Sequence, residues 1–191
     1  MSISRYDPRK NLEEEEANAI GTAYVRADLL PAADAARVRT LLKEYLDVRV
    51  DLYETREESR LKDIAVRRAK LQAALWAAVQ GPAAAPPTPI VALVVGGMND
   101  VINAQGYTQA AWWNRIPQAA WLLMILIAIC SNVLPGYGVH STKAARRLLL
   151  VMPLVVSMSF LLIADIDSPR GGVIRVHPQN LKALAESLPP S

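Results

Sequence analysis

Three polar residues in an otherwise apolar stretch are the first candidates for chemistry. Asn99, Asp100 and Asn103 fall within one helical turn, so a helix over residues 90–115 would place them on one face. If that helix lies inside a bilayer, Asp100 needs a partner or water, and the group becomes a candidate functional site. If the helix lies at the membrane interface, the three residues are its wetted side. Both interpretations stay open.

A second acidic group follows the last apolar run of the chain. Asp165 and Asp167 come directly after Leu148–Ala164. Carboxylates at the C-terminal end of a helix oppose the helix dipole, which indicates a cation or a basic partner nearby. The alternative is that these two residues mark the boundary with water.

Residue patterns typical of catalysis are missing from the sequence. It contains no zinc-protease helix, phosphate-binding glycine loop or nucleophile elbow. The two histidines, His140 and His177, fall in predicted connections and share no helical turn with a carboxylate. Cys130 is the only cysteine, so one chain builds neither a disulfide nor a cysteine zinc site. We therefore expect no enzyme activity, no metal site and no cofactor.

Charge is distributed unevenly along the 191 residues. Residues 1–70 contain 14 Lys or Arg and 14 Asp or Glu, so the net charge of +3 arises entirely in residues 71–191. A neutral, highly charged first third is unlike the basic surface of a nucleic-acid-binding protein, and we expect no nucleic-acid partner. Positive charge that faces lipid headgroups is the better interpretation.

Two long runs carry no charged side chain. These runs are Ile116–Gly138 and Leu148–Ala164, and a polar, basic tract separates them. A helix needs about 20 apolar residues to cross a hydrocarbon layer of about 30 Å, and both runs are near that length. The sequence therefore predicts a transmembrane hairpin of two helices over residues 116–166, with the lipid bilayer as its partner.

The other segments are predicted from helix signals and breakers. Residues 1–80 form a charged helical region of two helices broken at Pro31, where the preceding residues disfavour helical geometry. Residues 81–89 form a Pro/Ala linker, and Thr88-Pro89 can restart a helix. Residues 90–115 form an amphipathic helix that is either interfacial or buried in a bundle. Residues 167–191 form a C-terminal tail, in which residues 178–187 can form a short helix.

The second predicted helix is long and runs from Pro31 to Val79. Its apolar seam is strong at first, weak from Thr55 to Lys62, and then returns, which favours a helix partnered at both ends over a uniform coiled coil. The Glu13–Glu16 block of the first helix is interpreted as a solvated face. Tandem indoles at Trp112 and Trp113 before the first apolar run indicate a membrane-interface anchor.

Small residues form a stripe on the first helix. Ala19, Ala23 and Ala27 recur every four residues, and Gly21 lies beside them. Small side chains at that spacing let another helix approach closely. The stripe predicts helix packing, and the alternative is an exposed face of high helix propensity.

Four blocks carry a resemblance to a known family. They are RYDPR at 5–9, EANAIGTAYVRADLLP at 16–31, LKEYLDVR at 42–49 and ADIDSPRG at 164–171. With them, nearly the whole chain resembles the bestrophin-like family of bacterial membrane proteins. The resemblance implies an all-helical protein distantly related to the bestrophin anion channels, which are pentamers with a central pore and a cytosolic helical vestibule. Family members usually carry apolar spans before the first block, and this chain starts almost at that block. The resemblance transfers no pore residue to this chain.

Together these features predict an all-α integral membrane protein. We expect a homo-oligomer in the cell inner membrane that crosses it more than once, with the N-terminal helical region in the cytoplasm. The resemblance implies conduction of inorganic ions, with anions as the first expectation. The alternative is a non-conducting membrane scaffold in which the long helix over residues 32–79 binds a soluble partner through Leu41 and Leu52.

Overall fold

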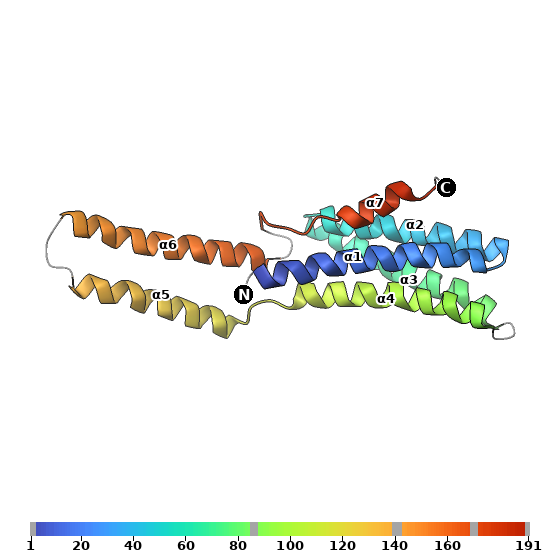
Figure 1. The fold of residues 1–191 in the computed structure, drawn as a ribbon, viewed down its shortest axis with the longest axis horizontal. Helices are drawn as coiled ribbons and strands as arrows, with labels where there is room; N and C mark the ends of the chain where they lie inside the picture. Colours follow the sequence, from blue (N-terminus) through green and yellow to red (C-terminus); the bar gives the residue numbers. More distant parts are fainter. Residues whose placement is uncertain (1–2, 85–87, 139–142, 169–171, 190–191) are drawn as a thin grey trace. The chain divides into compact units, whose positions relative to one another are not determined.

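The computed structural model describes residues 3–84, 88–138, 143–168 and 172–189. Every regular element in these ranges is a helix, and none of the described residues lies in a strand. The expected all-α class is therefore confirmed. Figure 1 shows the helices in chain order.

The chain divides into two compact units. The bundle unit consists of Tyr6–Trp113 and Val176–Ser191, and the hairpin unit consists of Asn114–Arg175 and Met1–Arg5. Residues 114–175 of the hairpin unit are therefore an insertion within the bundle unit. The chain leaves the bundle unit after Trp113 and re-enters it at Val176.

Four long helices and two short ones build the bundle unit, and Figure 1 shows the long helices side by side. Their bounds are α1 (Ile3–Arg26), η1 (Ala27–Leu29), α2 (Ala32–Glu54), α3 (Glu58–Ala84), α4 (Pro89–Trp113) and α7 (Gln179–Ser187). The break at Pro31 is present as expected, because the chain extends at Leu30 and restarts with the Ala35 N–H donating to the Pro31 carbonyl at 2.9 Å.

The single long helix expected over residues 31–79 does not form. The helix ends at Glu54, Thr55 is extended with φ −71° and ψ 132°, and α3 starts at Glu58. This break lies where the apolar seam is weakest, because polar residues there gain no burial from continuing the helix. A short connection makes antiparallel neighbours of α2 and α3, which contact each other closely.

The apolar side chains along α2 consequently pack against other helices of the same chain. Leu52 is buried and Leu41 is partly buried against the core. The main core contains buried apolar residues from α1, α2, α3, α4 and α7: Ala17, Ile20, Val38, Leu42, Leu46, Leu75, Val79, Val94, Met98, Val101 and Leu181.

Helix α4 packs within the bundle unit. It buries a face that includes Met98 and Val101, and it continues to Trp113. Trp112 is buried against α2, with its ring 5.0 Å from that of Tyr53 in an edge-to-face arrangement. Trp113 is 76% exposed, so only one of the two indoles is available as an interface anchor.

The connection before α4 is shorter than the predicted linker over residues 81–89. Helix α3 continues through Pro82 to Ala84. Thr88 then starts the next helix, because its Oγ1 accepts the Val91 N–H at 3.2 Å and so caps a free amide of the first turn.

The hairpin unit contains α5 (Gln118–Gly138) and α6 (Lys143–Asp167), which lie side by side (Figure 1). The rings of Trp121 and Phe160 are 6.3 Å apart between them. Among the described residues, one helical stretch, Pro89–Ser131, is long and apolar enough to cross a membrane, and no residue of its most apolar window is buried. This stretch overlaps the first of the two expected spans.

Candidate functional site

A buried ion pair occupies the interior of the bundle unit. Glu16 of α1 is fully buried and Arg49 of α2 is 1% exposed. The guanidinium donates to both carboxylate oxygens, from Nε to Oε1 and from Nη2 to Oε2, the latter at 2.9 Å. Two parallel bonds of this kind fix the orientation of both side chains and not only their separation.

Helix α4 completes the pair's surroundings. The Thr108 hydroxyl lies 3.2 Å from Glu16 Oε2 and 3.0 Å from the Ala104 carbonyl oxygen, so it can donate to either. The Tyr53 ring lies 5.9 Å from Arg49 Cζ, close enough for a cation–π contact. Three helices are therefore tied together at one level of the bundle.

Burial and charge together shift the pKa values at this level. Desolvation disfavours the charged guanidinium of Arg49, but the charge and hydrogen bonds of Glu16 outweigh it, and the pKa of Arg49 ends above its usual value. Burial first, and the negative charge of Glu16 second, raise the pKa of Tyr45 and of Tyr53. Both phenols are therefore neutral at physiological pH.

A layer of amide side chains lies next to the ion pair. Gln72 of α3 donates from Nε2 to Gln105 Oε1 of α4 at 3.2 Å, and its Nε2 is 3.5 Å from the Tyr45 hydroxyl. Arg68 Nη1 donates to Gln109 Oε1 at 3.3 Å. Burial, and then the positive charge of Arg49, lower the pKa of Arg68.

The network has more donors than acceptors. Arg49 Nη1, the Tyr53 hydroxyl and Arg68 Nε are buried without a hydrogen-bond partner within the described ranges. Among the residues that the structure describes, no cluster of His, Cys, Asp and Glu could hold a metal ion. The oriented ion pair joins α1, α2 and α4 and sets their register.

A second buried carboxylate joins α7 to α1. Glu13 is 1% exposed. Its Oε1 accepts the backbone N–H groups of Asn180 and Leu181, each at 3.0 Å, and its Oε2 accepts Nδ2 of Asn180 at 2.7 Å. These amides belong to the first turn of α7, which has no partners of its own for them.

The expected solvated face at Glu13–Glu16 is therefore only half correct. Glu14 and Glu15 are exposed, whereas the outer two residues of the block are buried. The spacing contained the signal, because Glu13, Glu16 and Ile20 recur at three- and four-residue intervals on one face of the helix. Arg49 could have been found in the same way, since it lies four residues after Tyr45 on the buried side of α2.

The polar group predicted on α4 lies on the outside of the bundle unit. Asn99, Asp100 and Asn103 are all exposed and share one side of the helix. Asp100 Oδ2 is 3.8 Å from Arg26 Nη1, a loose ion pair whose two side chains are 63% and 33% exposed. The structure thus brings these three residues together and leaves them accessible.

The acidic pair after the second apolar run binds backbone amides. Asp165 accepts the N–H groups of Val173 and Ile174 at 2.6 and 2.8 Å. Asp167 accepts the Ile116 N–H through both oxygens, at 3.0 and 3.2 Å. These carboxylates fold the chain back after α6 and join the start of the hairpin to its end.

The small residues of α1 face two different helices. A methyl group at Gly21 would lie 3.2 Å from Leu184 Cδ1 of α7, and one at Gly97 of α4 would lie 3.8 Å from the Ala23 Cα. Ala23 and Ala27 are buried, and Ala19 packs against the core.

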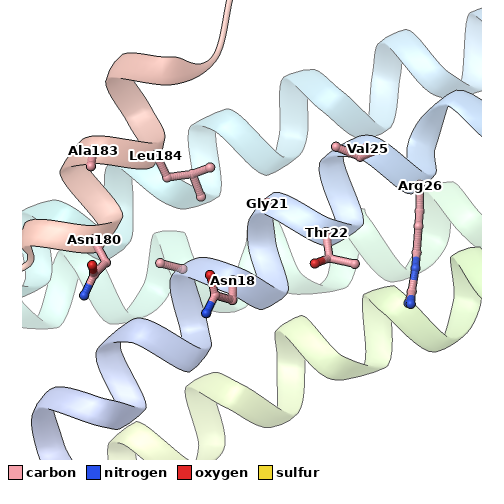
Figure 2. Close-up of a pocket in the computed structure, with 9 residues that line it drawn as sticks. Asn18, Gly21, Thr22, Val25, Arg26, Asn180, Ala183 and Leu184 are labelled. Carbon is pink, nitrogen blue, oxygen red and sulfur yellow. The ribbon is translucent and has the colours of Figure 1, made fainter.

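An open groove of about 640 Å³ runs along α1 beside α7 (Figure 2). Figure 2 shows Leu184 at its rim, directed toward Gly21. Asn18, Thr22 and Asn180 supply its polar groups. Without a buried, unpartnered side chain directed into it, the groove has the character of an exposed seam between two helices.

These observations place the chain in a broad class of proteins. It is an all-helical protein whose bundle is held by buried charged side chains, and it contains a candidate membrane-spanning stretch. The model of the Bestrophin-like domain matches residues 2–181. The chain therefore belongs to the bestrophin-like family, and this membership suggests a membrane protein with a distant relation to bestrophin anion channels. No curated protein and no solved structure matches the chain.

Proposed function

We propose that this chain is a subunit of an oligomeric ion channel of the inner membrane, anchored by α5 and α6 as a transmembrane hairpin. The observation that carries the proposal is the outward-facing apolar surface of these two helices. Leu122 and Leu126 of α5 are 62% and 51% exposed, and Leu154 and Leu161 of α6 are 62% and 70% exposed.

Such a surface is unfavourable in water. Burying a leucine side chain contributes about 1.5–3 kcal/mol, and the hairpin leaves large apolar side chains unburied around both helices. Lengths of 21 and 25 residues suit a hydrocarbon layer, which needs about 20. In a bilayer, lipid chains cover these apolar side chains, and no partner protein is needed to remove them from water.

The route for ions is proposed along the exposed face of α4. Exposed residues of α2 and α3 include many charges, whereas Asp100 is the only charged residue of α4. A helix face of glycine and amide side chains with one carboxylate is suited to line a hydrated path when several copies assemble. A ring of such carboxylates favours cations and opposes anions.

Membrane anchoring is tested first. The full chain, expressed in bacteria, should stay in the inner-membrane fraction after an alkaline carbonate wash and should need detergent for extraction. Recovery of a monodisperse protein from the soluble fraction would remove the hairpin from the proposal and the channel with it.

Conduction is tested with purified protein in planar bilayers. We expect ionic current from the wild type, and a several-fold higher chloride conductance from Asp100→Asn because the opposing charge is gone. Asp63→Asn is the matched control, since Asp63 is an exposed carboxylate on α3. Absence of current with both anions and cations would refute the channel, and equal conductance of the two variants would refute the path along α4.

A further inference from the structure

Helix α7 is a short element held by a carboxylate from another helix. The N–H groups of Asn180 and Leu181 lie in its first turn, and both donate to Glu13 Oε1 at 3.0 Å. Amides in the first turn of a helix have no partner within that helix, and a negative charge is favoured there. Glu13 therefore supplies from α1 the cap that the sequence of α7 lacks, since Pro178 makes no side-chain cap.

The helical state of α7 depends on this docking. It has nine residues, and isolated helices shorter than about 12–15 residues are marginal in water. Only Leu181 is fully buried, while Leu184 and Leu188 are partly buried against the core. Compared with the four long helices, α7 contributes little apolar surface to the bundle.

The other contacts of α7 and the residues after it are exposed. Lys182 pairs with Glu54 of α2, and both side chains are 49% exposed. Lys43 Nζ donates to the Pro189 carbonyl oxygen at 2.6 Å. Exposed ion pairs contribute little to stability because water screens them. The buried Glu13 carboxylate is thus the main polar contact that holds α7.

A short strap connects this docking site to the end of α6. Asp165 holds the backbone amide of Ile174, and Glu13 holds the amide of Asn180. Six residues of chain span at most roughly 20 Å when fully extended. While both carboxylates keep their amides, residues 174–180 are therefore anchored at both of their ends.

We propose that α7 is a detachable latch: it opens as one unit while α1, α2, α3 and α4 stay folded, and Glu13 is the residue that holds it closed. Cooperative opening of a small element below the global unfolding free energy is common in folded proteins. While the latch is closed, the chain that follows the hairpin unit is anchored to α1 through the amides of Asn180 and Leu181, and this anchor is lost when the latch opens. The latch does not depend on ion conduction.

Hydrogen exchange read by mass spectrometry on the full chain in detergent tests the latch. In Glu13→Gln the charge is lost, and we expect the amides of residues 179–187 to exchange about tenfold faster, since hydrogen bonds to charged groups contribute about 1.5–3 kcal/mol and each 1.4 kcal/mol is tenfold. Amides of α2 and α3 should exchange as in the wild type. Glu14→Gln, an exposed neighbour, is the control and should leave every segment unchanged.

A second variant keeps the test decisive if Glu13→Gln does not fold. Leu181→Asp places a carboxylate next to Glu13 from the side of α7 and leaves α1 intact. It should speed exchange in residues 179–187 alone. If α7 stays protected in both folded variants, or if exchange rises equally along all four long helices, α7 is an integral part of the bundle and the latch is refuted. Hydrogen exchange does not measure ionic current. The test of the latch is therefore valid even if the protein does not conduct ions.

Discussion

Removing one partner of the buried Glu16–Arg49 pair should destabilise the protein far more than removing both. Arg49→Met leaves a fully buried carboxylate with Thr108 as its remaining donor, and Glu16→Leu leaves a guanidinium that is 1% exposed. Breaking a buried pair in this way costs about 3–5 kcal/mol. Each single variant should lose about that much stability.

The double variant Glu16→Leu/Arg49→Met replaces the pair with apolar groups of similar size. Replacement of a buried ion pair by well-packed apolar residues is often close to neutral. Thr108 keeps an acceptor in the Ala104 carbonyl, 3.0 Å away, so no new buried donor is left unpaired. We therefore expect the double variant to lie within about 2 kcal/mol of the wild type, with a coupling free energy of about 4 kcal/mol or more.

Thermal unfolding in detergent, followed by tryptophan fluorescence, measures these differences. Trp112, one of four tryptophans, lies against Tyr53 one turn from the pair, so part of the emission reports on this part of the bundle. For a chain of this size 3–5 kcal/mol corresponds to a fall in Tm of roughly 6–20 °C. Arg60→Met on the exposed side of α3 is the control and should change Tm little. Single variants as stable as this control, or a double variant as unstable as the two singles combined, would refute the reasoning.

Three further outcomes follow from the packing and the pKa shifts. Gly97→Leu should destabilise by about 1–3 kcal/mol, because a Cβ there would already lie 3.1 Å from the Arg26 guanidinium and 3.8 Å from the Ala23 Cα, and a leucine adds more atoms at this contact with α1. A Cβ at Gly106 meets nothing within 4 Å, so Gly106→Leu should change Tm little. Gly172→Ala should loosen the turn after α6, seen as faster amide exchange there, since its methyl group would lie 2.5 Å from a backbone oxygen. Because the pKa values of Tyr45 and Tyr53 are raised, at least two of the six tyrosines should stay protonated at about pH 11 in an ultraviolet titration. Stability should accordingly fall above about pH 10, where tyrosines of the unfolded chain ionise and these two do not; full ionisation of the folded protein by about pH 11 would contradict the burial.

Local signals predicted the helix boundaries that depend on proline. The break at Pro31, the start of α4 after Thr88 and the short helix before Ser187 follow from φ restriction, capping and periodicity within a few residues. Such signals act within one helical turn, so they do not depend on the long-range contacts of the chain.

Long-range contacts account for what the sequence did not predict. The reversal between α2 and α3 depends on packing that becomes available only when the chain turns back, so the helical pattern across residues 55–57 was compatible with either outcome. In the same way, Glu16 looks like any acidic surface residue until Arg49, 33 positions later, is brought against it. The residues of the candidate site were thus visible in the sequence, but their burial was not.

The insertion of the hairpin unit into the bundle unit has a consequence for biosynthesis. Glu13 is synthesised 167 positions before its partner Asn180, and the whole hairpin is translated between them. Until then its carboxylate must remain hydrated, and the side of α1 that receives the last helix must stay uncovered. Packing around α1 is therefore completed only after the apolar segment has been translated. A nascent chain that stalls within the hairpin leaves this side of α1 accessible.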